Sequence, residues 1–218
     1  MPKIPNCLSS STQSRRHFFR AATASAIGLS RASSAAEARP NVLGQMPGYS
    51  PQIGVLISEM TWMRSAVLRA VKGMTQTQLD FLLDDKANRN GALLLHLAAT
   101  ERLYQLNTLD HVGVQALQDN SAFKEWQVPM QLGDAGRLQI KGHDLDYYLN
   151  ILRETREKTL TEFRKRDDQW LLSVDNSFVW GPTNNLCKWF HVCEHESHHA
   201  GQISLLASRT PGAKRTNG

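Results

Sequence analysis

The sequence predicts an all-α protein folded as a four-helix bundle, and three observations support this prediction. Four stretches of similar length repeat their apolar residues with the period of an amphipathic helix. The rest of the chain has no strong alternation of apolar and polar residues, which a half-buried strand would show. No segment repeats at the spacing of a solenoid protein. Four such helices can bury their apolar faces against one another, as a bundle does.

The first two long helices are predicted over residues 51–73 and 89–109. In the first, Leu56, Met60 and Val67 recur at helical spacing and share one face. Between the two helices, MTQTQLDF has the composition of a short helix that opens with a capping box. The second long helix contains the apolar run NGALLLHLAATERLYQL.

The third and fourth helices are predicted over residues 143–166 and 184–208. The third has an inner stripe that includes Tyr148, Leu152 and Phe163. The fourth ends before a Pro-Gly pair, which cannot continue a helix.

An irregular connection is predicted between the second and third helices, over residues 110–141. Pro129, Gly133 and Gly136 argue against one continuous helix there. The segment QVPMQL, residues 127–132, could instead pair as a short hairpin.

Residues 1–38 have the pattern of an export signal of the twin-arginine type. SRRHFFR supplies the arginine pair, Arg15 and Arg16, with Phe18 at the usual aromatic position. A mildly apolar stretch and an Ala-x-Ala cleavage motif follow it. We therefore expect a periplasmic protein that meets the twin-arginine export machinery in transit; a mitochondrial presequence is the alternative.

The expected domain organisation follows from these assignments. A linker covers residues 39–50, the bundle covers 51–210, and a flexible tail covers 211–218. The chain carries a net charge of +5, of which the export signal contributes +4 through five basic residues and one acidic residue. The remaining chain is therefore near neutral, which argues against a nucleic-acid partner.

Four histidines crowd into nine residues of the fourth helix: His191, His195, His198 and His199. His195 and His199 are four residues apart, so they lie about 40° apart around the axis and about 6 Å along it. Two imidazoles placed this way can bind one metal ion. The sequence therefore predicts a metal site that needs at least one further ligand.

The sequence of residues 195–199 also has the His-Glu-x-x-His form of a zinc protease. Such a protease takes its third ligand from downstream, but no His, Asp, Glu or Cys follows His199. The third ligand must therefore come from upstream, and His96 is the best candidate because it lies on an apolar helix face. His111 and His143 fall at helix edges and are expected at the surface.

Glu196 lies on the apolar side of the fourth helix, where a carboxylate needs a partner. The partner would be a ligand histidine's second nitrogen or an arginine from another helix. Glu196 is the candidate catalytic residue, as a group that orients a ligand or moves a proton, and Glu101 is a second such carboxylate. A ferritin-like di-iron site is disfavoured, because Glu196-x-x-His199 has no second Glu-x-x-His in the chain.

The motifs HLAATERLY (residues 96–104) and WFHVCEHESHHAGQISLL (residues 189–206) resemble the DinB superfamily of four-helix metal proteins. The resemblance extends over most of residues 50–210. It implies an up-down-down-up course of the helices and a metal triad of His96, His195 and His199. Some members of the superfamily are metal-dependent thiol transferases, so the resemblance also implies this activity, together with a homodimer.

We expect a divalent ion at this triad, with zinc as the first choice and nickel, iron or manganese as alternatives. The leading functional hypothesis is an exported metal-dependent thiol transferase or hydrolase that acts on a small molecule. The alternative is a module that binds a metal or ligand without turnover.

Overall fold

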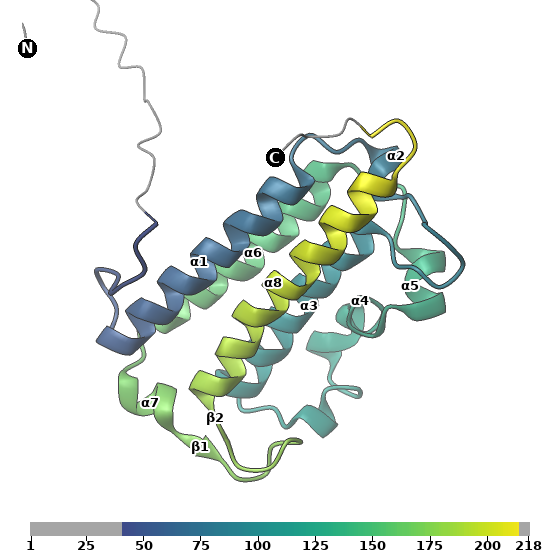
Figure 1. Ribbon diagram of the computed structural model, residues 1–218. Helices are drawn as coiled ribbons and strands as arrows, with labels where there is room; N and C mark the ends of the chain where they lie inside the picture. The colour runs from purple at the N-terminus through teal and green to yellow at the C-terminus, as the bar shows by residue number, and fades with distance from the viewer. Residues whose placement is uncertain (1–40, 214–218) are drawn as a thin grey trace, which may run out of the picture. The chain divides into compact units, whose positions relative to one another are not determined.

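Four long helices form the bundle in the computed structural model, which describes residues 41–213 (Figure 1). They are α1 (Pro51–Val71), α3 (Asn90–Thr108), α6 (Leu145–Phe163) and α8 (Asn185–Arg209). The all-α prediction is confirmed. The predicted export signal, residues 1–38, lies outside the described residues, as do residues 39–40 of the expected linker and 214–218 of the expected tail.

The helices follow the up-down-down-up course (Figure 1). The starts of α3 and α6 lie at one end of the bundle, because Asp80, between α1 and α3, accepts a hydrogen bond from the backbone of Gly142 just before α6. At the other end, Ser50 at the start of α1 donates to Asp168 just after α6. Two parallel pairs result, in which α8 packs beside α1 and α3 packs beside α6.

Short elements connect the long helices. They are α2 (Gln76–Leu79), η1 (Val114–Ala116), η2 (Ser121–Trp126), α4 (Gln127–Gln131), α5 (Gly133–Gln139), α7 (Asp168–Leu172), β1 (Val174–Asp175) and β2 (Thr183–Asn184). The two strands pair in antiparallel fashion, Val174 with Asn184 and Asp175 with Thr183, and make a small hairpin before α8.

The possible hairpin at residues 127–132 is wrong, because these residues form α4 and its C-cap. Pro129 is the third residue of this short helix, where its missing N–H is not needed for an intrahelical hydrogen bond. Leu132 and Gly133 then adopt positive φ angles of 55° and 60°, which separate α4 from α5. The connection is therefore a series of helical turns packed on α3 rather than a continuous helix.

Side-chain caps fix the starts of several helices. The predicted capping box is present in α2, where Thr75 accepts from the Gln78 backbone and Gln78 accepts from the Thr75 backbone. Asp144 accepts from the backbone of Tyr147 at the start of α6, and Asn184 accepts from the backbone of Cys187 at the start of α8. Each cap satisfies N–H groups that the first helical turn leaves unpaired.

The apolar core is divided into two halves along the bundle. One half contains Tyr148, and the other contains Phe163 and Trp189, all three fully buried. Between the halves, each long helix contributes one buried charged residue. These four residues, which we call the charged layer, are Arg64 on α1, Glu101 on α3, Arg156 on α6 and Glu196 on α8.

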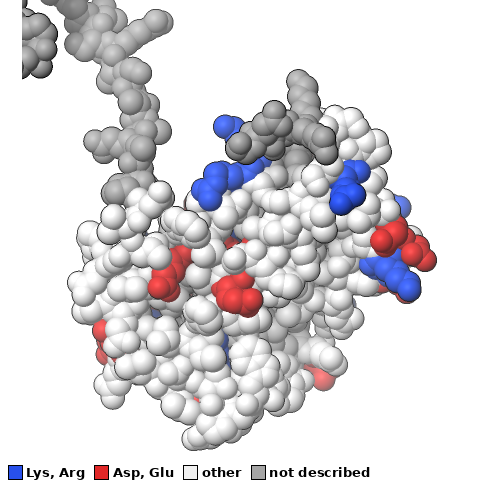
Figure 2. All heavy atoms as spheres, viewed as in Figure 1, with Lys and Arg blue, Asp and Glu red and all other residues white. Residues whose placement is uncertain are grey.

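On the face seen in Figure 2, acidic and basic side chains lie scattered among uncharged ones. None of the helices in the described part of the chain combines the length and the apolar character required to cross a bilayer.

The close approach of α3 to α6 gives a test of the packing. A Cβ atom at Gly91 would lie 2.6 Å from the ring of Tyr148, which is fully buried and cannot swing away. We expect Gly91→Ala to lower the free energy of unfolding by about 1–3 kcal/mol, the usual effect of overpacking. Urea denaturation measures the change.

Gly201→Ala is the matched control. Gly201 lies on helix α8, and a Cβ atom there would meet no side chain or neighbouring element within 4 Å. Alanine favours a helix over glycine by up to about 1 kcal/mol, so this variant should be as stable as the parent or more so. Equal unfolding midpoints for the two variants would contradict the proposed contact.

Candidate metal centre

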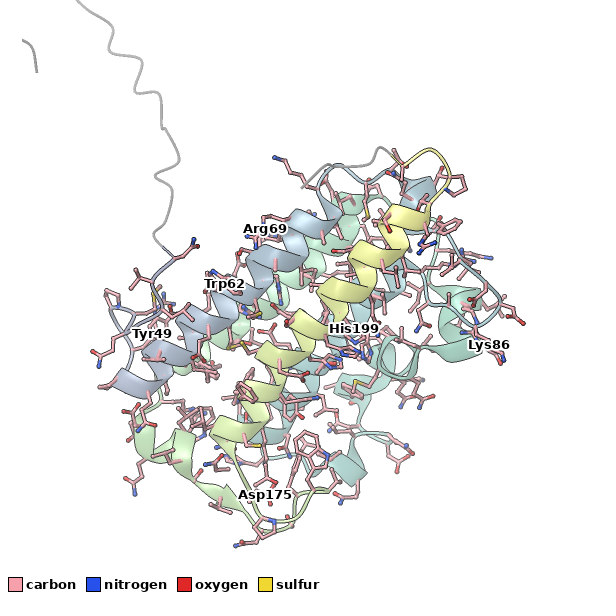
Figure 3. All side chains as sticks on the ribbon, viewed as in Figure 1. Tyr49, Trp62, Arg69, Lys86, Asp175 and His199 are labelled. Carbon is pink, nitrogen blue, oxygen red and sulfur yellow. The ribbon has the colours of Figure 1, made fainter. Side chains whose placement is uncertain are left out.

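Three histidine side chains from two helices meet at one point. Nε2 of His195 lies 2.9 Å from Nε2 of His96 and 3.1 Å from Nε2 of His199. His96 and His199 are buried and His195 is half-buried. Figure 3 labels His199 about midway along α8. The structure therefore brings together the three residues that the sequence selected as metal ligands.

The outer nitrogens of two of these rings are held by oxygen atoms. Nδ1 of His96 lies 2.9 Å from the carbonyl oxygen of Pro129 on α4, and Nδ1 of His199 lies 2.9 Å from Oε1 of Gln202. Because these oxygens can only accept, each Nδ1 carries the proton, and each Nε2 presents a lone pair to the cluster.

These lone pairs test whether a cation fits. Nε2 of His195 contacts both other Nε2 atoms, and a single proton on it could satisfy only one of them. The remaining contact would set two lone pairs against each other. A divalent ion bound by all three nitrogens removes this repulsion, so the residues present fit such an ion.

The protonation of the rings agrees with this fit. Burial and the neighbouring imidazoles lower the pKa of His195 to about 3 and that of His199 to about 4. Burial also lowers the pKa of His96, although hydrogen bonds to the backbone of Pro129 and Met130 oppose it. All three rings are therefore neutral at pH 7, the form that binds a metal.

The remaining histidines lie outside this triad. His198 is exposed and contacts Gln202, and His143 stacks on Tyr147 with ring centroids 3.8 Å apart. His111 is exposed and has a positive φ of 56°. His191 lies one turn before His195, and a second possible ligand group, of His191, Glu194 and His195, shares His195 with the triad.

Glu196 lies in the charged layer, where it is 1% exposed. Its Oε1 atom accepts from Nη2 of Arg64 at 2.6 Å and from Nη2 of Arg156 at 2.7 Å. The expectation that an arginine from another helix would pair with Glu196 is confirmed. Its Oε2 has no hydrogen-bond partner among the described residues. The acid–base role of Glu196 stays a prediction.

Glu101 completes the charged layer from α3. It accepts from Arg64 at 3.0 Å, from Arg156 at 2.8 Å and from the hydroxyl of Thr159 at 2.6 Å. Burial by itself would raise the pKa of Glu101, but the charges of both arginines and the hydrogen bonds from Arg156 and Thr159 outweigh it. The pKa therefore lies below its usual value. Two carboxylates and two guanidinium groups leave the layer without net charge.

Sequence reasoning missed several residues that position the triad. Gln202 had a usable signal, because it lies one helical turn after His199. Arg64 and Arg156 had a weaker one, as charged residues within the apolar stripes of their helices. Pro129 had none, because its contact with His96 depends on how the connection folds back onto α3.

A four-helix bundle with this course, carrying three histidines on its second and fourth long helices, is a DinB-like metal protein. Within that superfamily, residues 55–212 match the family model described as Mycothiol-S-transferase, and the chain belongs to this family. A search among curated proteins finds no match. Members of the family bind a divalent metal.

The charged layer predicts how stability depends on pH. Because the folded pKa of Glu101 is depressed, its contribution is complete above the unfolded value, near 4.5, and is lost as the pH falls below it. Glu101→Gln should lower the free energy of unfolding at pH 7 by about 3–5 kcal/mol, because it leaves Glu196 as the one carboxylate, among the described residues, that pairs with two buried guanidinium groups. The free energy of unfolding of this variant should also fall less steeply between pH 5 and pH 3 than that of the parent. Urea titrations at each pH measure both effects.

Glu157→Gln serves as the control, since Glu157 is exposed on α6 and, among the described residues, pairs only with Arg153. Exposed pairs of this kind contribute at most about 1 kcal/mol. If the free energy of unfolding falls by similar amounts in Glu101→Gln and Glu157→Gln, the charged layer contributes no more stability than a surface ion pair.

Proposed function

We propose that the protein is a metal-dependent thiol S-transferase, which joins the sulfur of a low-molecular-weight thiol to a small electrophile. Family membership supports the reaction class. The observation that carries the proposal is the convergence of three Nε2 atoms from α3 and α8, two of them on rings fixed through their outer nitrogens. The family description supports mycothiol as the thiol.

We propose zinc as the metal. Three neutral imidazoles form a common ligand set of catalytic zinc sites, in which a fourth position stays open. A divalent ion held here supplies Lewis-acid chemistry, which lowers the pKa of a thiol or water that reaches it. Nickel, iron and manganese accept similar ligands, so elemental analysis decides between them.

The residues of the chain prepare the site for this chemistry. Pro129 and Gln202 hold the rings of His96 and His199 in the orientation and tautomer that direct Nε2 inward. During transfer, a sulfur lone pair forms the new bond to the electrophilic carbon. The bond between that carbon and the leaving group breaks, and its electron pair departs with the leaving group. The thiol proton passes to water.

The His-Glu-x-x-His sequence does not support a protease. In that mechanism the glutamate acts as a general base on a water molecule. Here its counterpart, Glu196, instead accepts hydrogen bonds from Arg64 and Arg156 inside the bundle.

The first test is metal content. Purified full-length protein should contain about one divalent ion per chain, and His195→Ala should lose it, because His195 is the histidine that contacts both others. His143→Ala is the control and should keep the ion, since His143 stacks on Tyr147 outside the triad. Elemental analysis gives the stoichiometry, and circular dichroism checks that both variants fold. Full metal content in His195→Ala would refute the ligand assignment.

The second test is turnover. Metal-loaded protein should convert a thiol and an alkyl halide to the thioether, detected by mass spectrometry, and His195→Ala should show only the uncatalysed rate. Mycothiol, glutathione and cysteine serve as the thiols. Hydrolysis of the alkyl halide with no thioether formed from any thiol would indicate a hydrolase, and no turnover at all would indicate a binding module. Either result would refute thiol transfer.

A further inference from the structure

A row of aromatic rings extends from the metal centre toward the start of α8. The rings of His195 and His191 have centroids 5.0 Å apart, and the ring of Trp180 meets His191 edge-on at 5.2 Å. Trp180 lies in the loop between β1 and β2 and is 55% exposed. The row therefore leads from a half-buried ligand to an open aromatic surface.

His191, the middle of this row, is fixed from behind. Its Nδ1 lies 2.9 Å from the hydroxyl of Tyr104, which is on α3 and 3% exposed. Tyr104 is packed in turn against Phe178 and Trp189 in the core. His191 thus keeps its ring between His195 and Trp180.

Trp180 is also held in place, although it is exposed. Its ring packs edge-on against the buried Phe178 at 5.1 Å. The ammonium of Lys188, which is 2% exposed, lies 4.4 Å from the centroid of Phe178 and donates to Asp175 at 2.9 Å. The contacts of Phe178 with Lys188 and of Trp180 with His191 therefore hold the loop against α8. The exposed ring of Trp180 rests on the buried ring of Phe178.

We propose that Trp180, together with His191, binds a flat apolar group of the electrophile, next to the carbon that reacts at the metal centre. This inference rests on the proposed function. The two ring separations, 5.2 and 5.0 Å, place Trp180 close enough for one small molecule to reach both it and His195. Aromatic rings attract one another in offset and edge-on arrangements, so the substrate class is an electrophile with an aromatic ring near its reactive carbon.

A matched pair of electrophiles tests the proposal. Chloroacetamide and N-phenylchloroacetamide share one reactive carbon and differ by a single ring. With metal-loaded full-length protein, Trp180→Ala should raise KM for the phenyl compound by about two- to tenfold. It should leave KM for chloroacetamide and for the thiol unchanged, and Trp180→Phe should restore part of the loss.

Trp62→Ala is the control, because Trp62 is 41% exposed on α1 (Figure 3) and should change neither KM. Metal content should equal that of the parent in every variant. Equal changes for both electrophiles, no change for either, or a raised KM for the thiol in Trp180→Ala would overturn the proposal.

A binding measurement separates this proposal from thiol transfer itself. Acetanilide carries the same phenyl amide but cannot react, and saturation-transfer NMR detects its binding against acetamide as a reference. If Trp180→Ala weakens acetanilide binding and Trp62→Ala does not, the result would support the aromatic site at Trp180 even if no thiol transfer is found. Equal acetanilide binding by the parent and by Trp180→Ala would refute the aromatic site at Trp180 even if thiol transfer is confirmed.

Discussion

The charged layer across the middle of the bundle is the interaction on which the rest of the structure depends. Each long helix contributes one member, and the two arginines bridge both carboxylates. Burying four charges is costly unless each is paired. The four helices must therefore bring these residues to the same height along the bundle, and each helix must be rotated about its own axis so that its charged residue faces the others. On α8 that rotation follows from Glu196, which lies between His195 and His199 in sequence. The alignment of the layer therefore also brings α8 and α3 together at the triad.

The same five residues that spell a protease motif are used differently in this fold. The histidines of α8 meet His96, while the glutamate between them points into the charged layer. One helical segment thus supplies two of the three candidate metal ligands and one structural ion pair. The family match agrees with this division, because the matching family model is described as Mycothiol-S-transferase and not as a protease.

Much of the fold and the centre of the site could be predicted from the sequence, because both depend on helical periodicity. The positions of the four helices, the pairing of His195 with His199 and the need of Glu196 for a partner inside the bundle all follow from spacing along a helix. The position of α4, the carbonyl of Pro129 and the placement of Trp180 depend on how connections fold back onto the bundle. No periodicity marks such contacts, and the hairpin expected at residues 127–132 was wrong for this reason. Export stays a prediction.

Because α3 and α6 run in the same direction, the chain between them must travel back along the whole bundle. On that return it crosses the triad and offers the Pro129 carbonyl to His96. The affinity of the triad for a metal ion can thus be altered from this connecting segment, through changes that leave all three histidines and the four-helix framework intact. Connecting segments generally tolerate insertion and substitution better than the helices they join, so sequence changes there offer a route to altered metal retention.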